Sequence, residues 1–343
     1  MIPTGQTAGL TSRELFRRVM AFEPVERIPA IEWATWWDKT LRNWGEQGLI
    51  IPDEPPLGRG EALQRQFGLD THAQYWVRAT TDATPLAMSH GASIIEDEAG
   101  YEAILPTLYP RDSLSPERLD ALRYARNRGD ITWFTVDGFF WWPRSLLGIE
   151  RHLFSFYDQP GLYHRICADL ADFHLHVIER LCEVVTPDFM TFGEDMSYNN
   201  GPMLSEEMFD EFMLPYYRMV IPELKRRGVR VLIDSDGDIT QALPWFERAG
   251  IEGILPLERQ AGVDLLKLRE RHPRCLFIGH FDKMVMPHGE SAMRGEFERL
   301  LPVMRQGGFL PSVDHQTPPG VTLEQYLTYV KLLKEYCGKA VDA

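Results

Sequence analysis

Acidic residues crowd the end of one predicted strand of this chain. In the segment VLIDSDGDI (231–239), an apolar run is followed by Asp234, Asp236 and Asp238 around a single glycine. Carboxylates that are brought together repel one another unless a cation or a raised pKa relieves the repulsion. The segment therefore indicates a metal site, a general acid–base pair, or a site that recognises a cationic or hydrogen-bonding substrate.

The same pattern recurs at the ends of other predicted strands. The residues in question are Glu32, Asp137, Glu194, Asp195, Glu258, His280, Asp282, Asp314 and His315. An aspartate at such a position commonly caps the next helix or holds a turn, so capping is the alternative for each residue alone. As a set they indicate one shared site, and we expect at least one of Glu194 and Asp195 to point into it.

Strands and helices alternate regularly enough to predict how these residues meet. From Ile131 onward, six apolar strand cores are separated by helical stretches: ITWFTV, DFMTFG, RVLIDS, GILPLE, CLFIGH and FLPSVD. AIEW (30–33) and QYWVRA (74–79) bring the number of predicted strands to eight. No G-x-G-x-x-G or G-K-[ST] turn is present, so the pattern favours a closed (β/α)8 barrel over a doubly wound sheet. In a barrel, the carboxyl ends of the strands converge at one rim.

Two regions lie outside this repeat. The first is an N-terminal helix within 11–28, which begins with a capping-box pair, Thr11 and Glu14. The second is 75–107, where we expect an irregular insertion with an antiparallel hairpin at 92–107. The other predicted helices span 161–185, 205–227 with kinks at Pro215 and Pro222, 241–249, 264–271 and 323–337.

Composition excludes several classes of function. A net charge of −14 and a pI near 5.2 argue against a nucleic-acid partner, because phosphate binding needs a basic face. The four cysteines are far apart and form no C-x-x-C pair, which is typical of reduced core residues in an intracellular protein. No apolar run reaches the roughly 18 residues that a membrane span requires. We expect a cytoplasmic protein that acts on a small molecule, with neither membrane nor nucleic acid as partner.

Three segments resemble the uroporphyrinogen decarboxylase (URO-D) superfamily. They are TSRELFRRVMAFEPVERIP (11–29), GEDMSYNNGPMLSEEMFDEFMLPYY (193–217), and the stretch from DSDGDI (234–239) through GGFLPSVDHQTPPGVTLEQY (307–326). The resemblance implies an α/β fold, a distorted (β/α)8 TIM barrel that spans 1–343 as one domain. The superfamily includes heme-pathway decarboxylases and cobalamin-linked methyltransferases that act on methylcobamide and coenzyme M. Membership also implies a homodimer.

The motifs of both branches are altered here. Decarboxylases of the superfamily carry an RQAGR motif after the first strand, whose arginines bind substrate carboxylates, whereas this chain reads EWATWWDK (32–39). The zinc methyltransferases carry H-x-C-G and a later cysteine, where this chain has DSDG (234–237) and Asp314-His315. The resemblance therefore implies Asp234, Asp236 and His315 as ligands of zinc or another divalent metal. This harder ligand set favours water or oxygen ligands over a thiol acceptor.

Roles follow from these placements. We expect Asp236, Glu194, Glu258 and Asp314 to be catalytic. We expect the substrate to contact Trp33, Trp36, Trp37, Asp137, Arg144, Asp195, Tyr198, Asn199, His280 and Asp282. Core packing is the alternative for the aromatic residues, and an ordinary salt bridge is the alternative for Arg144.

The leading functional hypothesis is methyl transfer or demethylation of a small or medium organic substrate. The D-x-H-x-x-G corrinoid signature is absent, so a corrinoid or tetrahydrofolate carrier would come on a partner, such as a corrinoid protein. One alternative is decarboxylation of a tetrapyrrole-like or other carboxylic acid. A second is a metal-dependent hydrolase or lyase with a carboxylate as general base. Outside catalysis, the chain could be an inactive binding partner in a corrinoid methyltransferase system.

Overall fold

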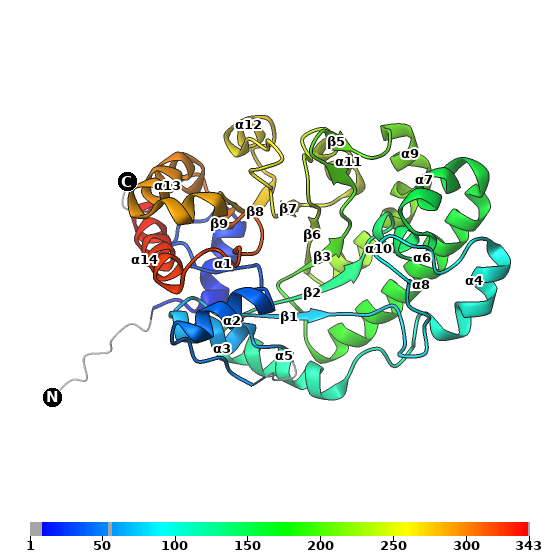
Figure 1. Cartoon of the computed structure of the whole chain (residues 1–343), viewed down its shortest axis with the longest axis horizontal. Helices are drawn as coiled ribbons and strands as arrows, with labels where there is room; N and C mark the ends of the chain where they lie inside the picture. The colour runs from blue at the N-terminus through cyan, green and yellow to red at the C-terminus, as the bar shows by residue number, and fades with distance from the viewer. Residues whose placement is uncertain (1–8, 54–56, 342–343) are drawn as a thin grey trace.

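Seven parallel strands form one curled sheet in a computed structural model that describes residues 9–53 and 57–341. Each strand pairs with its neighbours in chain order, and the helices lie on the outer side of the sheet (Figure 1). The strands are β1 (His72–Trp76), β2 (Ile131–Asp137), β3 (Phe189–Gly193), β6 (Arg230–Asp234), β7 (Gly253–Leu255), β8 (Leu276–Phe281) and β9 (Phe309–Val313). A separate antiparallel pair joins β4 (Ser197–Tyr198) to β5 (Gly201–Pro202). The predicted distorted (β/α)8 barrel is confirmed.

An extended segment without strand pairing fills the eighth position of the barrel. The prediction of a strand at 30–33 is therefore wrong. On one side, the Trp33 backbone N–H donates to Ser312 Oγ (3.1 Å) and its indole donates to Val313 O (2.7 Å). On the other, His72 Nε2 lies 2.7 Å from Glu32 O. Side chains replace the ladder of hydrogen bonds that a strand would make, and Pro29, just before the segment, has no N–H for such a ladder.

Helices follow the predicted pattern with shifted ends. They are α1 (Ser12–Met20), α2 (Asp38–Glu46), α3 (Gly60–Phe67), α4 (Glu98–Ile104), α5 (Pro116–Arg128), α6 (Trp141–Leu147), α7 (Ile149–Asp158), α8 (Pro160–Val184), α9 (Glu206–Phe212), α10 (Leu214–Arg226), α11 (Leu243–Ala249), α12 (Leu265–Arg271), α13 (Glu290–Met304) and α14 (Leu323–Lys339), with the 3₁₀ turns η1 (Leu105–Thr107) and η2 (Lys283–His288). The Thr11–Glu14 capping box is formed. The helix predicted at 205–227 breaks at Met213, because Pro215 has no N–H with which to continue α9. Across the described parts of the chain, every helix is too short or too polar to cross a bilayer.

The hairpin predicted at 92–107 is not formed. The chain leaves the sheet after β1 and returns through an isolated antiparallel bridge between Thr80 and Leu108, so an irregular excursion is present. Inside it, the Asp97 side chain accepts from Gly100 N (2.8 Å) and starts α4, which lies at the outer edge of the molecule (Figure 1). An aspartate three residues before a glycine is typical of a turn, but here the hydrogen bond from Gly100 N to Asp97 caps the first turn of a helix.

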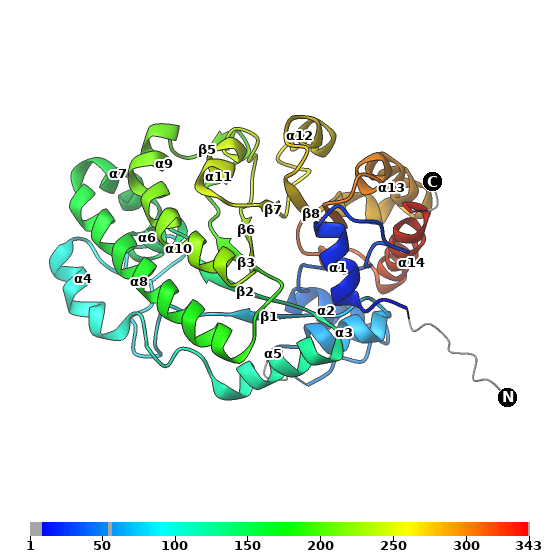
Figure 2. The same ribbon diagram turned by 180° about the vertical axis from the view of Figure 1, so that it is seen from behind.

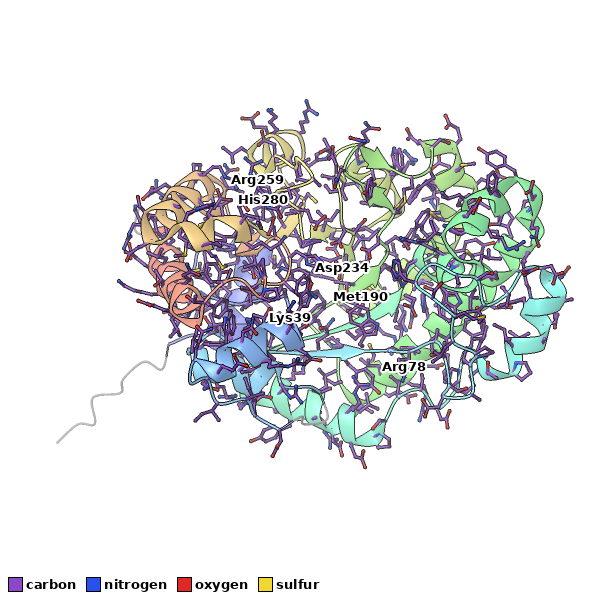
Figure 3. All side chains as sticks on the ribbon, in the orientation of Figure 1. Lys39, Arg78, Met190, Asp234, Arg259 and His280 are labelled. Atoms are coloured by element: carbon purple, nitrogen blue, oxygen red, sulfur yellow. The ribbon has the colours of Figure 1, made fainter. Side chains whose placement is uncertain are left out.

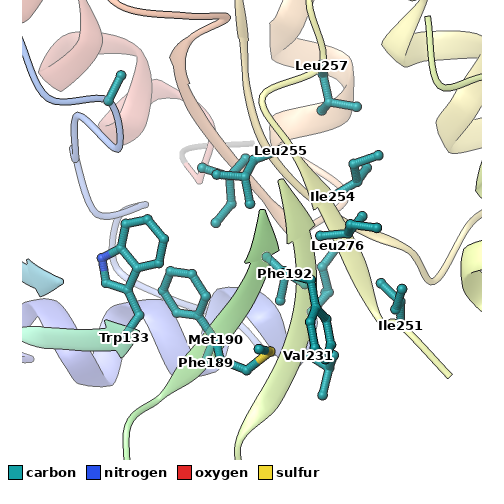
Figure 4. Packing of buried hydrophobic residues seen from close by; sticks show 14 of the residues in the cluster. Trp133, Phe189, Met190, Phe192, Val231, Ile251, Ile254, Leu255, Leu257 and Leu276 are labelled. Atoms are coloured by element: carbon teal, nitrogen blue, oxygen red, sulfur yellow. The ribbon is translucent and has the colours of Figure 1, made fainter. Parts of the chain in front are cut away.

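The barrel interior changes from apolar to polar along the strands. Near the amino ends, the rings of Trp133 and Phe189 stack at 4.9 Å (Figure 4). Two residues further along β2, Thr135 Oγ1 accepts from Gln74 Nε2 (2.9 Å) and lies 2.7 Å from Thr191 Oγ1. Because side chains alternate along a strand, the next inward position on β2 is Asp137. The interior is therefore packed at one end and acidic at the other.

One predicted strand-end carboxylate belongs to this interior. Glu32 is 1% exposed, and its Oε1 accepts a hydrogen bond from the Ser312 hydroxyl. Burial raises the pKa of Glu32 to about 8, against the opposing effect of that hydrogen bond. The folded state thus holds the Glu32 proton more tightly than the unfolded chain does, and the stability that this gives is lost as pH rises from about 4.5 to about 8.

Glu32→Gln is expected to make the protein more stable than the wild type at pH 8.5, and to leave it nearly unchanged at pH 4.5. The amide keeps an acceptor for Ser312 and cannot ionise, so the free energy of unfolding should gain on the order of 1 kcal/mol at the higher pH. Urea denaturation at both pH values measures the difference. Glu150→Gln, at an exposed position on α7, is the control. An equal gain at both pH values would contradict the assignment.

Candidate functional site

Two inward-facing aspartates flank a glycine at the carboxyl end of the barrel. Gly193 at the end of β3 is in register with Asp137 on β2 and with Asp234 on β6. Residues in register on parallel strands face the same side of the sheet, so both carboxyls face the barrel mouth about 10 Å apart at the backbone. Gly193 has no side chain between them, and a Cβ there would be in ordinary contact with Thr135 and the Trp76 ring.

Asp236 links two overlapping groups of potential metal ligands. One group is Asp236, Glu258 and His315, and the other is Asp195, Asp234 and Asp236. Within each group, the ligating atoms all lie within 4.8 Å of one another. His315 Nε2 lies 3.5 Å from Asp236 Oδ2, and their side chains are 26% and 37% exposed. The ligand trio predicted from the sequence thus splits, because Asp234 lies in the second group and Glu258 accompanies His315.

Backbone contacts fix the loop that carries Asp236. The Asp236 N–H donates to Asp195 Oδ1 (3.2 Å), and the Gly237 N–H donates to Glu258 Oε2 (2.9 Å). Gly237 has φ 82°, and a Cβ there would come within 2.7 Å of the Ser197 backbone. Only glycine therefore allows this loop to pack against β4. Asp195 also has a positive φ of 36°, a costly conformation for a residue with a side chain.

Burial and mutual repulsion raise the pKa values of two aspartates in the cluster. Burial, with the charges of Asp195 and Asp236, holds the pKa of Asp234 well above its usual range. Burial and the Asp236 charge raise the pKa of Asp195 to about 6. Burial would lower the pKa of His315, but its contact with Asp236 outweighs that effect and raises it. A divalent cation would replace those protons, since it compensates several carboxylates at once.

Glu194 lies outside the cluster, contrary to its predicted catalytic role. The side chain is fully buried and accepts hydrogen bonds from the backbone N–H groups of Phe139 (2.9 Å), Phe140 (2.8 Å) and Trp141 (3.0 Å) and from the Tyr217 hydroxyl. A Cβ at Gly138 would overlap the Glu194 carboxylate. The three backbone donors lie at the amino end of α6 and the hydroxyl lies on α10, so Glu194 anchors both helices on β3. Of the Glu194–Asp195 pair, Asp195 is the member that joins the cluster.

Asp314 is fully buried and does not reach the ligand groups either. Its carboxylate accepts from Arg259 N (3.0 Å), Lys283 N (3.3 Å) and Lys283 Nζ (3.2 Å). It thereby ties together the loops that follow β7 and β8. Burial and the Asp236 charge raise the pKa of Glu258, and the charge of Lys283 opposes this rise. The sequence analysis missed Lys283, although its position just after the acidic end of β8 was a usable signal.

His280 and Asp282 turn away from the rim. His280 Nδ1 lies 2.8 Å from Leu257 O, and its Nε2 lies 3.2 Å from Arg299 Nη1 on α13. Figure 3 shows His280 beside Arg259 and apart from Asp234. Gly279 (φ 109°) and His280 (φ 69°) interrupt the strand alternation and swing the imidazole outward. Asp282 Oδ1 caps η2 through Met284 N (2.9 Å). Neither residue stands where a substrate contact was predicted.

The aromatic residues divide between core and rim. Trp36 is 7% exposed and packs on Phe67 and Tyr326, so it belongs to the core. Trp33 is held by its indole hydrogen bond to Val313. Trp37 remains 43% exposed, with its ring edge-on to His315 at 6.4 Å between centroids. Of the predicted tryptophans, Trp37 is therefore the one placed beside the ligand groups.

A second part of the rim comes from α6 and the β4–β5 turn. Arg144 lies over the Trp141 ring (5.0 Å) and donates to Asp195 O (3.5 Å). Tyr198 is 67% exposed, and Asn199 beside it is also exposed. Trp76, 46% exposed at the end of β1, is a further candidate that the sequence analysis missed. Burial raises the pKa of Asp137 to about 7, so this carboxyl can carry a proton near neutrality.

Comparison with known proteins agrees with this architecture. The family model described as uroporphyrinogen decarboxylase (URO-D) matches residues 144–336. A methyltransferase from Methanosarcina mazei has a similar structure, with a TM-score of 0.71, 14% identity, and coverage of 96% of this chain and 99% of that one. A Listeria monocytogenes protein described as a vitamin-B12-independent methionine synthase gives a TM-score of 0.45, with 10% identity and coverage of 91% and 97%.

No curated protein matches the sequence at a significant level. At 14% identity, the likeness to the Methanosarcina methyltransferase shows a shared fold. The URO-D match covers more than half of the chain, and it includes Asp195, Asp234, Asp236, Glu258 and His315. The chain therefore belongs to the uroporphyrinogen decarboxylase family.

Proposed function

We propose that this protein is an enzyme that binds a divalent metal ion through Asp236, Glu258 and His315 and transfers a methyl group from a small or medium organic substrate. The observation that carries the proposal is the convergence of two carboxylates and one imidazole within 4.8 Å at an accessible barrel rim. Active sites of (β/α)8 enzymes lie at this end of the barrel. The Methanosarcina methyltransferase has the same fold, which agrees with the proposal at the level of architecture.

The donor set fits a catalytic metal ion. Carboxylate and imidazole ligands suit zinc, manganese or iron, and three protein ligands leave a position open for substrate. The exposed fractions of Asp236 and His315 leave that position accessible. When bound, the metal would act as a Lewis acid that polarises an oxygen of the substrate. Because the pKa of His315 is raised, binding must release its proton, and metal affinity should rise with pH.

The surrounding side chains supply the remaining functions. Trp37 and Tyr198 offer exposed rings that a planar substrate could pack against. In demethylation of a methoxylated compound, the methyl–oxygen bond breaks and the methyl group passes to an acceptor. Asp137 would then give its proton to the oxygen left behind. The acceptor would be a corrinoid or tetrahydrofolate carried by a partner protein.

The charges at the rim argue against decarboxylation of a substrate with many carboxylates, which is the alternative to methyl transfer. A substrate with many carboxylates needs several free cations at the site. Arg144 lies against Asp195, and Lys283 is paired with Asp314. Lys283 is thus neutralised by a carboxylate and Arg144 already donates to a backbone carbonyl, which favours an uncharged or weakly anionic substrate. Metal-dependent hydrolysis uses the same ligands and is separated from methyl transfer by its products.

Metal analysis followed by a product assay tests the proposal. We expect about one equivalent of a divalent transition metal per chain, removed by a chelator and restored by Zn²⁺ or Mn²⁺. Methoxylated aromatic compounds with free cob(I)alamin or tetrahydrofolate should then yield a demethylated product by mass spectrometry. Failure of the protein to bind any of Zn²⁺, Mn²⁺ or Fe²⁺ would overturn the metal assignment. Hydrolysis or CO₂ release without methyl transfer would overturn the reaction.

A further inference from the structure

A basic cleft lies at the opposite end of the barrel from the acidic cluster. Its volume is about 840 Å³, and it is formed by α1, the end of α5 and the loops that precede β3, β6 and β7. Figure 2 shows α1 on the near side of the molecule in the rear view. Seven lysine and arginine residues line the cleft against four acidic residues. This excess of positive charge contrasts with the net charge of −14 for the whole chain.

Only some of these cations have acidic partners. The neutralised residues are Arg13, paired with Asp188 (2.8 Å), Arg227, paired with Glu223 (2.6 Å), and Arg230, paired with Glu252 (3.1 Å). Within 9–53 and 57–341, Arg17, Arg18, Arg126 and Lys225 form no ion pair. The Glu14 carboxylate, a further acidic group of the lining, accepts from Thr11 N (2.8 Å) in the capping box. Four cations of the cleft therefore lack a carboxylate partner.

Arg126 stands where these charges converge. It is half-buried and donates to the Thr186 carbonyl just before β3. Burial and the charges of Arg13 and Arg17 lower its pKa, and the single charge of Asp188 only partly offsets them. Like charges that a fold holds together without compensation reduce its stability, which is typical of a binding site rather than of a structural contact.

We propose that this cleft binds a small anion that carries two or more phosphate groups, such as a nucleoside di- or triphosphate. Guanidinium groups bind phosphate oxygens in pairs, and a diphosphate offers charge for all four unpaired cations. A volume of about 840 Å³ lies within the range of small-molecule pockets. The cleft and the acidic rim are at opposite ends of the strands, so the anion is a second ligand and not the substrate.

Isothermal titration calorimetry on the full chain at 0.05 M and 0.15 M salt tests the site. The probes are ATP, pyrophosphate, inorganic phosphate and citrate, each without added metal. We expect ATP and pyrophosphate to bind and to raise the melting temperature, with inorganic phosphate and citrate at least about tenfold weaker. Tighter binding of ATP than of pyrophosphate would identify a nucleotide, and equal binding would identify the diphosphate group alone.

Two charge-reversal variants in the cleft and one outside it test where the anion binds. Arg17→Glu and Lys225→Glu change exposed side chains without ion pairs, so both variants should fold, and each should weaken ATP binding about tenfold or more. Lys331→Glu, the same reversal on an exposed position of α14, should leave affinity unchanged. The proposal is overturned if ATP does not bind, if all three variants weaken binding equally, or if citrate binds as tightly as pyrophosphate.

Discussion

The Asp236→Asn variant is expected to lose divalent-metal binding at the rim and still fold like the wild type. Asp236 is the residue shared by both ligand groups, so its charge contributes wherever the ion sits. An amide is a poor ligand, and the variant removes the carboxylate that lies 3.5 Å from His315 Nε2. Zinc affinity should fall about 100-fold or more by calorimetry, and turnover of any demethylated substrate should fall at least as far. The melting temperature of the metal-free protein should stay constant or rise, because one repelling charge is removed.

Asp238→Asn is the matched control for this variant. Asp238 lies two residues further along the same loop, and its carboxylate accepts a hydrogen bond from Thr240 N (3.0 Å). It is absent from both ligand groups. Equal metal affinity in Asp236→Asn and wild type would remove Asp236 from the site. A large fall in melting temperature for Asp236→Asn would instead indicate that its charge holds the loop together.

Glu194→Ala is expected to destabilise the fold more than any other substitution considered above. The alanine leaves three backbone N–H groups and the Tyr217 hydroxyl without an acceptor in a fully buried place. Buried donors without partners each cost about 1–3 kcal/mol, so the free energy of unfolding should fall by roughly 3 kcal/mol or more. Urea denaturation measures this loss.

A conservative variant and a surface control test whether the loss of stability comes from the Glu194 hydrogen bonds. In Glu194→Gln one carboxylate oxygen becomes an NH₂ group that faces donors, so we expect an intermediate loss of stability. Glu211→Ala, on the exposed side of α9, should change stability little. Loss of substrate turnover in Glu194→Ala without loss of stability would contradict the structural role and return Glu194 to the catalytic residues.

The regular strand–helix repeat from Ile131 onward could be predicted from the sequence. Strands with both faces buried appear as continuous apolar runs, and six of these runs from Ile131 onward are strands β2, β3, β6, β7, β8 and β9. Their carboxyl ends predicted a rim that gathers acidic residues, and Asp195, Asp234, Asp236, Glu258 and His315 do lie together there. The start of the first helix could also be predicted, because the Thr11–Glu14 capping box is formed.

Irregular segments were not predictable in the same way. The segment at 30–33 looks like a strand, yet its hydrogen bonds go to the side chains of Ser312 and His72, which are remote in sequence. The apparent hairpin at 92–107 becomes α4 because Asp97 caps a helix. In both cases the local pattern fits two conformations, and contacts with other parts of the chain select one of them.

The sequence by itself determined which residue types stand at the barrel rim, because apolar strand cores fix where each strand ends. Only the tertiary structure decided which of these side chains share a site. Glu194 and Asp195 are neighbours in the chain, but one anchors α6 and the other faces Asp236. His280 leaves the rim because two successive positive φ angles reverse its direction. A side chain's direction depends on backbone angles and on donors contributed by distant elements, and neither is encoded in the spacing of residues along one strand.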